Sequence, residues 1–144
     1  MADPNKGRLR LLAEDAEDLA VISAAVQDAV VQVGDITYEP AAHKLTLAFN
    51  RFCWESEKPE RVRTGLQLGD VMGVKARRLR RETPGAVLSL LAVEFEPGEA
   101  PGGSVVFHFA GDADLRAEVE CLSAVLADVS EPWPARRSPI HEAE

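Results

Sequence analysis

A two-residue alternation of apolar and polar side chains in the last third of this chain constrains its fold more than any other feature. The alternation occupies residues 91–96, 105–109 and 115–119, and a loop rich in Pro and Gly and a Gly-Asp turn separate the three segments. This pattern is typical of strands that place one face on a core, and short connections between such strands favour antiparallel neighbours. We therefore predict a three-stranded antiparallel meander in this part of the chain.

A helix is predicted near the N-terminus. Asp15 is a good N-cap, and apolar residues follow it in steps of three and four that form one helical stripe. Gly34 suits the C-terminal cap of the same helix. We therefore predict a helix between these two residues, after a short strand at 8–11. The apolar stripe consists of Leu19, Ile22, Val26, Val30 and Val33.

The middle of the chain, from residue 36 to residue 76, alternates between apolar and polar residues in the manner of further strands. The apolar positions are odd-numbered through the first part of this region, but Phe52 and Trp54 are even-numbered. A β-bulge near Asn50 and Arg51 would return both aromatic side chains to the core, because a bulge inserts one extra residue into a strand. We predict a bulge at that point.

The spacing of apolar residues changes again at the end of the predicted domain. Residues 122–129 carry apolar side chains at i, i+3, i+4 and i+7, which predicts an amphipathic helix. Together the elements predict an α+β fold: a curled, mostly antiparallel sheet of about seven strands, shaped as a roll or half-barrel, with one early helix and a C-terminal capping helix. A meander followed by a helix is similar in order to pleckstrin-homology-like rolls.

Length and composition are those of one soluble domain. The chain has 144 residues, of which 46% are apolar and 28% charged, and none of its apolar runs approaches the roughly 18 residues that a membrane span needs. Residues 1–7 are expected to form a disordered tail, residues 8–129 one domain, and residues 130–144 a Pro-rich C-terminal tail. Because Cys53 and Cys121 lie in apolar segments and the N-terminus lacks a signal-peptide pattern, we expect a cytoplasmic protein without a disulfide framework.

Three segments carry a family resemblance. They are LLAEDAEDLAVISAAVQDAVVQVGDITYEP at 11–40, NRFCWE at 50–55 and LSLLAVEFEPGEAPGGSVVFHFAGDADLRAEVECL at 88–122. In this order they resemble an uncharacterised family of small alphaproteobacterial proteins, named domain of unknown function 2948, and the likeness extends from Leu9 to about Val129. The resemblance implies a compact bacterial cytoplasmic protein. It implies no activity and no catalytic residues.

Charge is distributed unevenly along the chain. The net charge is −8, but basic residues outnumber acidic ones between Arg51 and Arg81, and the densest run of cations lies at 75–81. On a strand these cations would point to both faces, so the segment must lie at a sheet edge or project beyond the sheet. We predict that it binds an acidic protein or another anionic partner, and that Trp133, between two prolines, is an anchor for a partner. The predicted contact residues are Lys75, Arg77, Arg78, Arg80, Arg81 and Trp133.

A non-catalytic binding or adaptor module is the function that these features favour, and two alternatives stay open. One is an enzyme whose pocket would bring together His108, Cys53 and Arg51. The other is a homodimer in which exposed strand edges pair. Nucleic-acid binding is not expected of an acidic chain without aromatic residues interleaved in its basic run. Since metal-ligand spacings, a phosphate loop and a hydrolase elbow are absent from the sequence, we assign no catalytic residue, metal ligand or cofactor.

Overall fold

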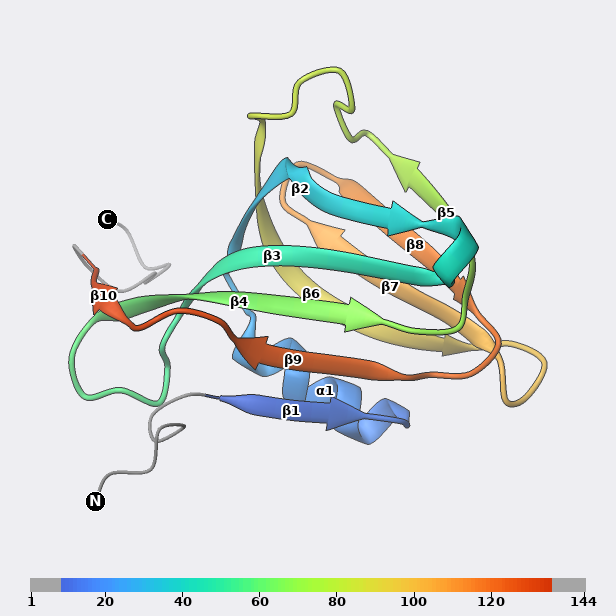
Figure 1. Ribbon diagram of the computed structural model, residues 1–144, viewed down its shortest axis with the longest axis horizontal. Helices are drawn as coiled ribbons and strands as arrows, with labels where there is room; N and C mark the ends of the chain where they lie inside the picture. The colour runs from blue at the N-terminus through green and yellow to red at the C-terminus, as the bar shows by residue number, and fades with distance from the viewer. Residues whose placement is uncertain (1–8, 136–144) are drawn as a thin grey trace.

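Ten β-strands make up most of residues 9–135, which are the residues that the computed structural model describes (Figure 1). The tail predicted at 1–7, and the part of the predicted C-terminal tail beyond residue 135, lie outside these residues. The strands are β1 (Arg10–Ala13), β2 (Val30–Glu39), β3 (Lys44–Phe52), β4 (Glu60–Leu68), β5 (Val71–Arg77), β6 (Val87–Pro97), β7 (Gly103–Phe109), β8 (Ala113–Val119), β9 (Ala124–Asp128) and β10 (Trp133–Pro134), and the helices are α1 (Ala16–Ala25) and the 3-10 helix η1 (Pro40–Ala42).

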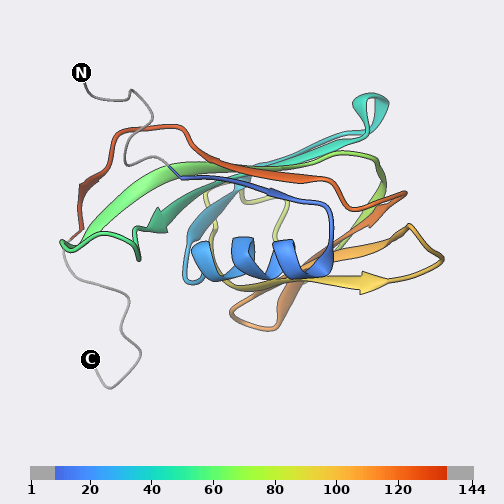
Figure 2. The ribbon, with the colours of Figure 1, turned by 90° about the horizontal axis from the view of Figure 1, so that it is seen from below.

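The strands form one open, curled sheet in the order β1-β9-β4-β3-β2-β6-β7-β8-β5, and β10 pairs with β4. Every pairing is antiparallel. The sheet folds back on itself, so that the half containing β3, β4 and β9 faces the half containing β6, β7 and β8 across the core, with α1 between the two walls (Figure 2). The predicted curled antiparallel sheet, early helix and meander are confirmed, but the number of strands was underestimated.

Helix α1 packs against β1 and β6, between the two walls of the sheet (Figure 2). Its predicted N-cap is confirmed, because the Asp15 carboxylate accepts a hydrogen bond from the Asp18 N–H at 2.8 Å. The predicted C-terminal end at Gly34 is wrong: the helix stops at Ala25, and the chain reverses through Asp28, whose φ is +63°. No helix in the described part of the chain is long and apolar enough to cross a membrane.

The C-terminal capping helix predicted at 122–129 is wrong, because residues 124–128 form strand β9 between β1 and β4. The side chains of Ala124, Leu126 and Asp128 are buried and those between them are half-buried, so the true period is two. A carboxylate at the third inward position hid that period in the sequence. Since no helix ends the described chain, the order of elements differs from the pleckstrin-homology-like order that we considered.

The β-bulge predicted near Asn50 and Arg51 is wrong as well. Strands β3 and β4 keep one register from Leu45 opposite Leu68 to Phe52 opposite Arg61. Arg51 itself occupies the next inward position of the odd-numbered series and is fully buried. The inward series therefore continues through Arg51, and the neighbouring Phe52 is buried as well.

Candidate functional site

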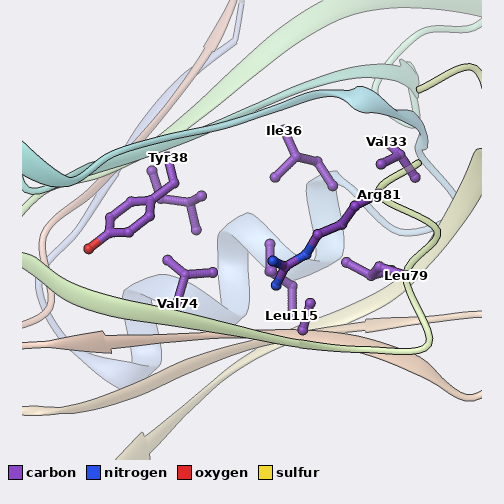
Figure 3. Close-up of a pocket in the computed structure, with 9 residues that line it drawn as sticks. Val33, Ile36, Tyr38, Val74, Leu79, Arg81 and Leu115 are labelled. Carbon is purple, nitrogen blue, oxygen red and sulfur yellow. The ribbon is translucent and has the colours of Figure 1, made fainter. Parts of the chain in front are cut away.

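A cavity of about 250 Å³ lies in the seam where the sheet does not close. Strands β2 and β3 form one side of this seam cavity, and β5 and β8 form the other (Figure 3). The two sides meet at one end, where the Val71 N–H donates a hydrogen bond to the His43 carbonyl at 2.9 Å. The residues that line the seam cavity are Val33, Ile36, Tyr38, Leu45, Val74, Ala76, Leu79, Arg81 and Leu115.

The loop at 78–86, between β5 and β6, brings Arg81 to the seam cavity. Hydrogen bonds to β2 hold this loop across the seam: the Gly34 N–H donates to the Pro84 carbonyl at 2.8 Å, and the Val33 N–H donates to the Ala86 carbonyl at 2.9 Å. A Cβ at Gly34 would stand 3.1 Å from Pro84, so the absence of a side chain there permits the close approach. Figure 3 shows the side chain of Arg81 entering the cavity.

Arg81 is the one charged residue among the nine that line the cavity. Within residues 9–135 its side chain has no ion-pair or hydrogen-bond partner. The only other polar side chain in the lining is Tyr38, and its hydroxyl points away from the guanidinium in Figure 3. A cation with five N–H donors thus faces a cavity whose other walls are almost entirely apolar.

The remaining cations of the predicted segment lie outside the seam cavity. Strand β5 ends at Arg77, which hydrogen-bonds the carboxylates of Asp112 and Asp114, at 2.7 Å from Nη2 to Asp114 Oδ2. The hydrogen bonds from Arg77 lower the pKa of Asp112 below its usual value. Arg78 has a φ of +61° and its Nη1 lies 3.8 Å from the same Asp112 carboxylate. Lys75 and Arg80 are exposed, so only Arg81 of the five joins the cavity.

Trp133, the sixth predicted contact residue, lies in β10 and pairs with Arg61 at the beginning of β4. Strand β5 follows the opposite end of β4, so Trp133 and the seam cavity belong to different ends of the molecule (Figure 1). The Trp133 side chain is 37% exposed. The structure therefore does not join Trp133 and the basic segment into one surface.

Arg51 belongs to a buried network that connects β3, β4 and β9 with Leu9, the residue just before β1. Its Nε and Nη2 atoms donate to the two Asp128 carboxylate oxygens at 2.9 and 2.8 Å, and it also donates to both carboxylate oxygens of Glu55. Asp128 accepts further hydrogen bonds from the Thr64 hydroxyl and the Leu9 N–H. Burial alone would raise the pKa of Asp128, but the hydrogen bonds from Arg51, Leu9 and Thr64 outweigh it and lower that pKa. The network is saturated and leaves no donor of Arg51 directed at a ligand.

The three side chains required by the enzyme alternative do not converge. Cys53 is buried beside Arg51, and burial raises the pKa of its thiol, which disfavours the nucleophilic thiolate. His108 lies on β7, separated from β3 by β2 and β6, and its Nε2 is 2.7 Å from Glu94 Oε1. In the described part of the chain, no group of three or more His, Cys, Asp or Glu side chains is arranged to hold a metal ion.

Comparison with known proteins gives a family and nothing finer. The profile of the family described as Protein of unknown function (DUF2948) matches residues 9–141. The chain belongs to the DUF2948 family. No curated protein and no solved structure matches it.

The sequence pointed to one residue of the site in this DUF2948 protein. Arg81 was part of the predicted basic segment, but the apolar lining was missed. Val33 was assigned to a helix, and Leu45, Val74 and Leu115 read as ordinary inward positions of separate strands. An inward residue that packs against another side chain has the same sequence pattern as one that lines a cavity. The difference between them depends on how far the sheet curls.

Proposed function

We propose that the chain is a non-catalytic binding module that holds a small anionic ligand in the seam cavity, with Arg81 as the anion-binding side chain. One observation carries the proposal: the Arg81 guanidinium enters an apolar cavity and has no partner among residues 9–135. Ligand pockets are commonly lined by apolar side chains with a few polar groups that fix the orientation of the ligand. Arg81 is exposed, and its planar guanidinium can donate two charge-assisted hydrogen bonds to one anion.

The other exposed cations support this proposal by raising the local positive potential. Lys75 and Arg80 are exposed on the same short segment as Arg81, whereas the chain as a whole is acidic. A local positive potential attracts anions and speeds their association. The acidic-protein partner and the homodimer stay predictions: a pull-down with Arg77, Arg78, Arg80 and Arg81 charge-reversed tests the first, and light scattering tests the second.

Calorimetric titration of the full chain with octane-1-sulfonate, a single anion on an apolar chain, tests the proposed function. Arg81→Gln is expected to weaken binding by about tenfold or more, because a hydrogen bond to a charged group contributes about 1.5–3 kcal/mol. Ala76→Phe is expected to abolish binding, since the larger side chain occupies the cavity. Near-ultraviolet circular dichroism shows whether each variant keeps its packing.

Arg80→Gln is the matched control, because it removes the same charge one residue away and outside the cavity lining. Its affinity for octane-1-sulfonate should fall much less than that of Arg81→Gln. Equal losses in the two arginine variants would show that binding follows overall charge and not the cavity, and the proposed function would then be wrong.

A further inference from the structure

The charge of the seam cavity limits the charge of its ligand. Arg81 supplies one positive charge, and none of the other eight lining residues is ionised at neutral pH. A ligand with one negative charge is balanced by this cation, whereas a phosphate monoester carries about −1.5 to −2 charges and would leave an unbalanced charge against apolar walls. The planar guanidinium fork also matches the two oxygens of a carboxylate.

The walls of the cavity limit the body of the ligand. Seven of the nine lining residues are aliphatic, and beyond Arg81 the only polar side-chain group is the Tyr38 hydroxyl, which points away from the guanidinium (Figure 3). A sugar or nucleoside would bury hydroxyl and amide groups without side-chain partners, and each such group costs free energy when it is left unpaired. The lining therefore favours a hydrocarbon body.

The dimensions of the cavity favour a chain over a ring. Its lining follows β2 from Val33 to Tyr38, a length of roughly 16 Å at the usual rise of a strand. A cavity of about 250 Å³ that extends over this length is elongated, which suits a chain better than a ring.

From these three limits we infer that the seam cavity takes an aliphatic monocarboxylate of medium chain length, an inference that rests on the proposed binding function. The carboxylate lies on the Arg81 guanidinium, which the side chain carries from the 78–86 loop to the middle of the lining, between Ile36 and Leu115 (Figure 3). The hydrocarbon chain runs from there along β2 toward the Tyr38 ring, between Ile36 on one side and Val74 on the other (Figure 3).

Four compounds with eight carbons each separate the features of this ligand class: octanoate, octan-1-ol without a charge, octyl phosphate with a second charge, and 4-methylbenzoate with a ring. Isothermal titration of the full chain, below micelle-forming concentrations, is expected to give octanoate an affinity at least tenfold above each of the other three.

The variant Arg81→Gln should lower the affinity for octanoate to that for octan-1-ol. Arg81→Lys should retain part of the preference, because it keeps the charge and loses the planar fork. Arg80→Gln should lower the affinity for octanoate much less than Arg81→Gln does.

The results distinguish the ligand class from the proposed function. If octane-1-sulfonate binds through Arg81 but octyl phosphate, octan-1-ol or 4-methylbenzoate equals or exceeds octanoate, the ligand class is overturned and the binding function stands. If neither octane-1-sulfonate nor octanoate loses affinity in Arg81→Gln, both are overturned. If octanoate alone shows the tenfold preference and loses it in Arg81→Gln, the inference is supported.

Discussion

Two arginines of this protein are opposites in their surroundings. Arg51 is fully buried, and Asp128 and Glu55 each accept two hydrogen bonds from its guanidinium. Arg81 is exposed at the seam cavity and has no such partner among residues 9–135. A buried charge must be paired to be tolerated, so the first arginine is part of the fold. The second is free to receive a ligand.

The two arginines differ in whether their hydrogen-bond donors have partners, more than in how deeply they are buried. Arg51, the structural charge, has partners, and Arg81, the proposed binding group, has none among residues 9–135. The hydrogen bonds from Arg51 join β3 to β9 through Asp128, and Asp128 in turn holds Thr64 of β4 and the N–H of Leu9 just before β1. This network fastens strands that lie side by side. The side chain of Arg81 connects no two elements, because backbone hydrogen bonds to β2 hold its loop in place.

The largest effect is expected from breaking the buried pair. Arg51→Met leaves the Asp128 carboxylate buried without its counter-charge, which typically costs about 3–5 kcal/mol of unfolding free energy. The measurement is chemical denaturation of the variant and the wild type by the same denaturant. A loss within experimental error would mean that Arg51 is not the structural half of the comparison.

The double variant Arg51→Met, Asp128→Leu sharpens this result. It removes both charges together, so no uncompensated buried charge remains, and part of the loss should be recovered. A double variant that is less stable than Arg51→Met would show that the Thr64 and Leu9 hydrogen bonds to Asp128 matter more than its charge.

A fall in pH is expected to lower the unfolding free energy through the same region, by a smaller amount. The pKa of Asp128 is lowered in the fold, so the unfolded chain, whose aspartate pKa is about 3.9, takes up a proton first as the pH falls. The stability that Asp128 contributes is therefore complete above about pH 5 and is lost as the pH falls through its folded pKa. Asp128→Asn lacks this titration, so its unfolding free energy should change less than that of the wild type between pH 5 and pH 2.

Denaturation series at several pH values provide the test, with Asp114→Asn as a control at an exposed ion pair. The wild type and Asp128→Asn should converge at the acid end. Parallel curves for these two proteins would contradict the lowered pKa of Asp128.

The buried network also explains both errors in predicting the strands. Inward apolar residues precede Arg51 in β3 and Asp128 in β9, and each charged residue continues the inward series of its strand. A charged side chain is normally exposed, so the sequence pattern placed both residues outside and suggested a bulge in one strand and a helix in the other. A single sequence does not reveal that two charges 77 positions apart neutralise each other. The meander was predictable because all of its inward positions are apolar or small.

Only the positive charge of the candidate site could be predicted from the sequence. The density of cations at 75–81 included Arg81, the charged residue of the cavity lining, but Arg77 and Arg81 look alike in sequence. They differ because Asp112 and Asp114 of the β7–β8 turn and β8 face Arg77 across the sheet, while Arg81 lies beyond the end of β5. Which arginine stays unpaired is decided by strand register, and register is fixed by the whole sheet.

The smallest effect on stability is expected at Arg81, the residue proposed to bind the ligand. Arg81→Gln should change the unfolding free energy of the free protein by no more than about 0.5 kcal/mol, as is usual for a surface substitution that removes no partner. At one high ligand concentration, the same substitution should lower the melting temperature of the complex relative to the wild-type complex, because the stabilisation by a ligand rises with the logarithm of its concentration divided by its Kd. Differential scanning calorimetry with and without octanoate measures both quantities on one sample.

Arg51→Met should show the reverse: a low melting temperature without ligand and a normal shift with it, as long as the seam stays folded. If Arg81→Gln instead unfolds at a much lower temperature without ligand, Arg81 has a structural role, and the distinction between the two arginines fails.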